Sequence, residues 1–159
     1  MNTLNAIGLD IIKSEELATK LNILLANYSV FYQNVRGYHW NIKGEKFFEL
    51  HLKFEELYND LLLKIDEIAE RILTLGHAPD HRFTNYQQIS GIQENCIMYN
   101  GDTAVRDILS SFKIIIGLQR ELWYLASDTN DEGTNALMSD YIRLQEKWVW
   151  MYSSYVNKE

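Results

Sequence analysis

The chain has 159 residues, a length typical of one domain, and 47% of them are hydrophobic, so it can bury a core without disulfide bonds. Its 15 basic and 22 acidic residues give a net charge of −7, which disfavours binding to nucleic acid or anionic membranes. The single cysteine, Cys96, excludes an intramolecular disulfide, fits a reducing compartment and is interpreted as an apolar filler. Neither a signal peptide nor a membrane span is recognisable. We therefore expect one cytoplasmic domain over residues 1–159.

The first part of the chain predicts two long helices. Apolar residues recur at spacings of three and four over residues 15–40, which predicts a helix with Ser14 as its N-cap. Gly44 supplies the reversal that follows. The second predicted helix covers residues 45–75. Gly76 directly follows it, and the chain's single proline, Pro79, lies three residues further on, which is a usual helix ending.

The remainder predicts a long connection and two more long helices. Residues 77–101 form the connection, with a short helix over residues 84–89. The last two helices are expected over residues 102–127 and 131–156. Four long helices with one long middle connection predict an all-α, ferritin-like four-helix bundle, in which the second and third long helices run parallel.

Potential metal ligands lie at regular spacings on the second predicted helix. His51 and Glu55 are four residues apart, as are Asp66 and Glu70, so each pair projects from one face. Three turns separate the pairs, which places them on the same face but roughly 16 Å apart. One ion cannot contact both pairs of a single helix. The common alternative is a solvated face with unrelated charges.

An antiparallel second copy of this helix would bring the two pairs together. Both pairs are symmetric about one point, the Asp60–Leu61 bond. A two-fold axis at that point sets His51 opposite Glu70 of the other copy, and Glu55 opposite Asp66. An isologous dimer would therefore form two identical sites.

His39 precedes the predicted reversal and completes the candidate ligand set. A helical hairpin centred near residue 45 places His39 beside His51. Two imidazoles and three carboxylates suit a divalent first-row metal, iron or manganese in particular. A structural zinc site would favour thiolates, and Ca²⁺ would take only oxygen ligands.

Three segments of the sequence carry a recognisable signature. They are YHWNIKG at residues 38–44, the positions Phe48, His51 and Phe54-Glu55, and DEIAERI at residues 66–72. These segments resemble the signature of the Dps family, the mini-ferritins. The resemblance covers nearly the whole chain, including the short helix in the connection and the aromatic-rich last helix.

The resemblance implies a ferroxidase that protects against oxidative stress. A hollow dodecamer would take up Fe²⁺, oxidise it, preferably with hydrogen peroxide, and store ferric mineral inside. By motif position, one subunit would supply His39, His51 and Glu55 to each site, and its mate would supply Asp66 and Glu70. The family usually carries Asp where this chain has Glu55. The resemblance implies no organic cofactor.

Five further residues have two interpretations each. Trp40, next to a candidate ligand, is either an electron donor, a role that the resemblance implies, or an interface or core aromatic. Asp131 and Glu132 either line a three-fold pore that concentrates Fe²⁺ or provide favourable charge at a helix N-terminus. His77 and His81 are four apart, but a proline between them breaks helical geometry, so we expect loop residues rather than metal ligands.

Three alternatives to the ferroxidase are distinguishable. A DNA-compacting protein with secondary metal binding is disfavoured by the charge balance and by the lack of a basic tail. A di-iron oxygenase would place Glu three positions before a ligand histidine. This chain has Arg36, Phe48, Thr74 and Ala78 at those positions. A bundle used only for interaction has no reason to place five ligands at these spacings.

Overall fold

The structure is a computed structural model that describes residues 3–157, so the two residues at each end of the predicted domain lie outside the described part. Its regular elements are α-helices, as predicted, and within the described residues no helix is long and apolar enough to cross a membrane. In chain order the helices are α1 (Ile11–Asn41), α2 (Phe47–Thr74), α3 (Phe83–Ile89), α4 (Gly101–Asp128) and α5 (Glu132–Val156).

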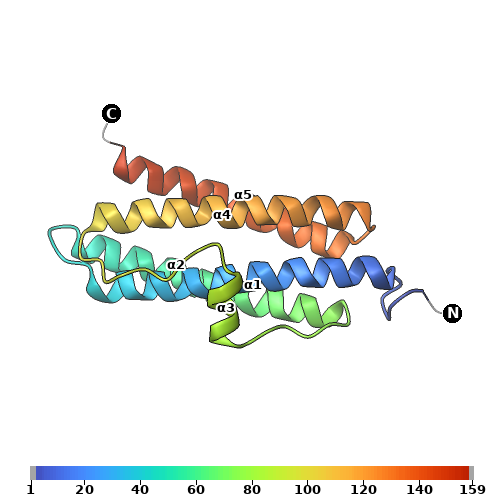
Figure 1. The fold of residues 1–159 in the computed structure, drawn as a ribbon. Helices are drawn as coiled ribbons and strands as arrows, with labels where there is room; N and C mark the ends of the chain where they lie inside the picture. The colour runs from blue at the N-terminus through green and yellow to red at the C-terminus, as the bar shows by residue number, and fades with distance from the viewer. Residues whose placement is uncertain (1–2, 158–159) are drawn as a thin grey trace.

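The helices form two antiparallel hairpins that pack side by side (Figure 1). One hairpin is α1 with α2, and the other is α4 with α5. The connection that contains α3 runs back along the bundle, so α2 and α4 point the same way. The predicted four-helix bundle with a short helix in its middle connection is confirmed.

The hydrophobic core fixes which face of α2 is exposed. The buried side chains of α2 recur at helical spacing, among them Leu50, Phe54, Leu57 and Leu61. In the centre of the bundle, the Phe31 and Phe112 rings meet edge to face with centroids 5.3 Å apart. Because this apolar stripe turns inward, the opposite face of α2, which carries the candidate ligands, turns outward.

The first helix begins earlier than predicted, so the assignment of Ser14 as N-cap is wrong. Asp10 caps α1, because its carboxylate accepts a hydrogen bond from the backbone N–H of Lys13 at 3.0 Å. Ser14 lies inside the helix and is buried. Its hydroxyl accepts a hydrogen bond from the Asn5 amide at 3.1 Å.

Neutral polar groups occupy part of the bundle interior. Tyr28 donates a hydrogen bond to Gln119, Gln119 donates to Gln145 at 2.8 Å, and Gln145 donates back to Tyr28 at 2.6 Å. All three residues are buried, and their ring of hydrogen bonds ties α1 to α4 and α5. The buried glutamine and tyrosine side chains offer amides and a phenol rather than the paired carboxylates of an intrasubunit di-iron centre.

A largely buried ion pair connects the end of α2 to the start of α5. The Arg71 guanidinium donates to the Asp131 carboxylate at 2.6 Å and to the Thr134 hydroxyl at 2.9 Å. Asp131 also caps α5, accepting a hydrogen bond from the Thr134 backbone N–H at 3.0 Å. A Cβ atom at Gly133 would lie 2.6 Å from the guanidinium, so glycine permits this close approach.

Candidate metal centre

The two histidines predicted to meet lie against each other where α1 and α2 approach the Gly44 turn. Gly44 has a φ of 110°, a left-handed conformation that suits glycine. The His39 and His51 rings are stacked, with centroids 3.8 Å apart and planes inclined by 13°. His39 is buried and His51 is half-buried.

Each histidine is hydrogen-bonded to the backbone of the other. Nδ1 of His39 lies 2.6 Å from the His51 carbonyl oxygen, and Nδ1 of His51 lies 2.7 Å from the His39 carbonyl oxygen. Because a carbonyl oxygen only accepts, Nδ1 of each ring must donate. In the neutral imidazole, Nε2 then carries a lone pair that can bind a metal ion.

Aromatic side chains flank the two stacked histidines. The Phe47 ring lies 4.9 Å from that of His51, inclined by 23°. The Tyr58 ring meets His39 edge-on at 5.3 Å. Sequence analysis did not single out these two residues. The spacing signals only the first contact, because Phe47 is four positions before His51 on the same helix, whereas the contact of Tyr58 with His39 depends on how α1 packs against α2.

The predicted carboxylate ligands lie on the outward face of α2. Glu55 is half-buried one turn from His51, whereas Asp66 and Glu70 are exposed further along the helix. Their carboxylates make no hydrogen bond or ion pair with any other described residue. Within residues 3–157, no three histidine, cysteine or acidic side chains of one protomer gather as a metal site. A single protomer thus brings together the imidazoles but not the distant carboxylates.

Exposed apolar side chains share this outward face. Phe48 is 82% exposed and Leu73 is 58% exposed, and the two are symmetric about the Asp60–Leu61 bond. Leu62, next to that point, is 47% exposed. Helical geometry places these residues within roughly 60° of the ligand direction. An exposed apolar stripe of this kind is typical of a protein–protein contact surface.

Comparison with known proteins identifies the family. A model of the ferritin-like domain matches residues 18–159. The DNA protection during starvation protein of Porphyromonas gingivalis is 38% identical over 138 residues, covering 87% of this chain and 87% of that protein. The chain belongs to the Dps family, within the ferritin-like superfamily. The resemblance drawn from the sequence is therefore confirmed.

Solved Dps structures extend the likeness to the fold. The crystal structure of a Dps protein from Vibrio cholerae O1 matches with a TM-score of 0.97 and 53% identity, and the match covers 99% of both chains. That protein is described as a member of a broad superfamily of ferritin-like diiron-carboxylate proteins. Dps from Staphylococcus aureus matches with a TM-score of 0.87 and 31% identity, covering 91% of this chain and 97% of that one.

The other residues that the sequence analysis singled out in this Dps chain differ in their exposure and location. Trp40 is 55% exposed, and the Arg36 guanidinium lies 4.8 Å from its ring centroid. His77 and His81 lie in the connection outside the helices, as predicted. Cys96 is exposed, so its assignment as an apolar filler is wrong, because it lies in the connection after α3 rather than in a helix that packs into the core.

The structure separates the two acidic residues predicted for a pore. Asp131 is 2% exposed and its carboxylate is engaged by Arg71 and the α5 cap, which disfavours a pore role for this residue. Its alternative role, favourable charge at a helix N-terminus, is the one observed. Glu132 is exposed in the first turn of α5, and a role in a pore stays a prediction for this residue.

Proposed function

We propose that this Dps-family protein oxidises Fe²⁺ at sites shared between two subunits and stores the ferric product, protecting the cytoplasm against oxidative damage. The observation that carries the proposal is the imidazole pair, whose Nδ1 hydrogen bonds leave both Nε2 atoms available for a metal ion. Membership of a family with ferritin-like diiron-carboxylate relatives supports iron as the substrate. The symmetry of the exposed carboxylates and apolar residues on α2 supports the sharing of each site.

The proposed site assigns a role to each ligand. His39, His51 and Glu55 of one subunit would hold Fe²⁺ together with Glu70 of the partner subunit. Asp66 of the partner subunit would bind through water or orient a ligand. Anionic carboxylates stabilise Fe³⁺ more than Fe²⁺, and this favours electron loss. Hydrogen peroxide would accept one electron from each of two Fe²⁺ ions as its O–O bond breaks, and hydrolysis of the ferric ions would release protons.

The assembly proposed is a homo-oligomer built from such dimers, a hollow dodecamer by its likeness to the family. Its three-fold openings would admit Fe²⁺, with Glu132 as the remaining acidic candidate at their rim. Trp40, next to His39, would serve as an accessory electron donor.

Iron titration of single-ligand variants tests the proposal. Anaerobic Fe²⁺ is added to the parent protein and to His51→Ala, Glu70→Ala and Glu16→Ala, and peroxide then starts the oxidation. We expect either ligand variant to oxidise Fe²⁺ about tenfold more slowly or worse, because each removes a ligand from the same site. Glu16 is an exposed carboxylate on α1 and serves as the control. Equal rates in all four proteins would remove the catalytic assignment.

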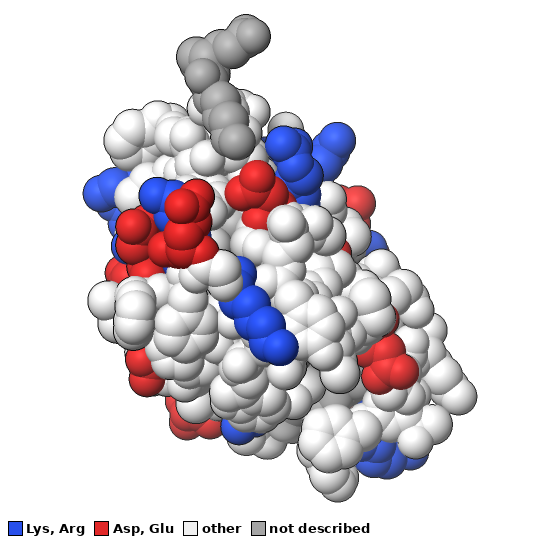
Figure 2. Space-filling model, turned by 90° about the vertical axis from the view of Figure 1, so that its left-hand side faces the viewer, with Lys and Arg blue, Asp and Glu red and all other residues white. Residues whose placement is uncertain are grey.

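DNA compaction is the second candidate function, because the relatives are named for DNA protection. The net charge of −7 opposes it. On the face shown in Figure 2, basic side chains are interspersed with acidic ones and do not form one basic surface. A gel shift with metal-free protein at low salt is the direct measurement. Retention of bare DNA would restore this role.

A further inference from the structure

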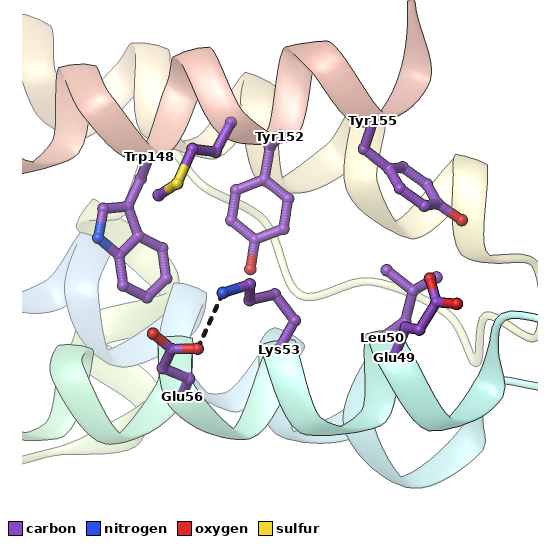
Figure 3. A pocket seen from close by; sticks show the side chains of 8 residues that line it. Glu49, Leu50, Lys53, Glu56, Trp148, Tyr152 and Tyr155 are labelled. Carbon is purple, nitrogen blue, oxygen red and sulfur yellow. Dashed lines mark hydrogen bonds and ion pairs between the residues drawn. The ribbon is translucent and has the colours of Figure 1, made fainter.

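A cavity of about 170 Å³ lies between α2 and the C-terminal half of α5 (Figure 3). Aromatic and aliphatic groups of Leu50, Trp148, Met151 and Tyr152 form its walls. The α2 residues that line the cavity include Lys53, which projects roughly opposite to the face that carries the candidate metal ligands. It is therefore separate from the proposed iron site.

A buried hydroxyl without a hydrogen-bond partner points across this gap. Tyr152 is 5% exposed, and its hydroxyl makes no hydrogen bond with any described residue. In Figure 3 the ring extends from α5 toward α2, so that the hydroxyl lies in the space between the two helices. Because an unpaired buried polar group is unfavourable, this hydroxyl would gain from pairing with a polar group that enters the space.

The charged residues around the cavity are already paired with each other. Lys53 Nζ lies 3.0 Å from the Glu56 carboxylate, and Lys46 Nζ lies 3.8 Å from that of Glu49. Because these opposite charges compensate one another, the cavity offers little net attraction to an ion. Its unused polar group is the Tyr152 hydroxyl, which can both donate and accept.

Size, wall chemistry and the free hydroxyl together define a ligand class. A cavity of about 150 Å³ with apolar walls is large enough to bind benzene. We propose that this cavity binds a small, uncharged aromatic compound with one hydroxyl group, a phenol, whose ring packs against Trp148 and Met151 and whose hydroxyl pairs with Tyr152. The inference does not rest on the proposed ferroxidase function.

Methyl NMR of the assembled protein tests this site. The chain has 4 methionines, and Met151 lines the cavity, so ¹³C-methyl labelling of methionine provides a local reporter. Phenol is titrated into the parent, and benzene provides a ring of the same size without the hydroxyl. We expect phenol to shift the Met151 signal in a saturable way. Tyr152→Phe, which keeps the ring, should weaken phenol binding about two- to tenfold and leave benzene binding unchanged.

Two controls separate this result from other causes. Tyr124→Phe removes a hydroxyl from an exposed tyrosine and should leave phenol binding unchanged. Glu70→Ala should also bind phenol like the parent, whatever its rate of iron oxidation. The inference is overturned if phenol leaves the Met151 signal unmoved, or if Tyr152→Phe binds phenol as the parent does. The first result would mean that the cavity takes up no phenol, and the second that the Tyr152 hydroxyl does not pair with it.

Discussion

Each imidazole of the candidate metal centre is oriented by the backbone of the other histidine. A free imidazole exchanges its proton between two nitrogens, but here a carbonyl oxygen holds that proton on Nδ1. Rotation of either ring would break one of these hydrogen bonds and separate the stacked rings of His39 and His51. Under the proposed function, less side-chain entropy is therefore lost when an ion binds to these rings.

A buried tyrosine gives a residue-scale prediction about alkaline pH. Burial raises the pKa of the Tyr152 phenol, and the nearby Glu56 carboxylate adds to the effect. In the unfolded chain the phenol ionises near pH 10. Above about pH 10 the unfolded state therefore loses a proton that the folded state keeps. The free energy of unfolding then falls as the pH rises. Tyr152→Phe should be more stable than the parent near pH 8 by about 1 kcal/mol and lose less stability between pH 10 and 11.

Urea unfolding at a series of pH values measures this effect. The exposed Tyr124 provides the matched control, because Tyr124→Phe removes a phenol that is not buried. We expect its stability to follow that of the parent across the range. A Tyr152→Phe curve parallel to the parent curve above pH 10 would contradict the prediction.

At the scale of elements, α2 and α5 are held together by Arg71 and Asp131. Asp131→Ala removes both the helix cap and the partner of a largely buried guanidinium, so we expect a loss of about 3 kcal/mol or more in the free energy of unfolding. Glu132→Ala, at the adjacent exposed position, should change it by no more than about 0.5 kcal/mol. Urea or thermal unfolding of both variants distinguishes the two residues. Similar losses would refute the structural role given to Asp131.

The elements also show what the sequence could and could not predict. Apolar periodicity and the glycines at helix ends located the long helices to within a few residues, and the spacing of His39 and His51 around a turn predicted that they meet. The ion pair of Asp131 with Arg71 could not be predicted, because the two residues are 60 positions apart and the contact depends on how α2 packs against α5. The reciprocal imidazole bonds likewise depend on the close approach of two helix backbones.

The whole-molecule proposal is that each site draws ligands from two chains, and mixed assembly tests it. His51→Ala and Glu70→Ala subunits are unfolded together and reassembled. In a mixed dimer, one site receives His51 from one chain and Glu70 from the other and is intact, whereas the second site lacks both. Random mixing makes about half of the dimers mixed, so about a quarter of the sites should be restored.

Iron oxidation by the reassembled mixture is the measurement. We expect about a quarter of the parent rate, from two proteins that are each nearly inactive. Each variant reassembled alone is the control for refolding. A mixture no more active than its components would show that the ligands come from one chain and would refute the shared site.

The described part of one protomer gathers no three candidate ligands in one place. Under the proposed function, a newly synthesised chain is therefore inert toward iron until it pairs. The reaction is confined to finished particles, where its insoluble product has an enclosed space in which to collect. Dilution that separates the pairs would switch the chemistry off, and reassociation would restore it.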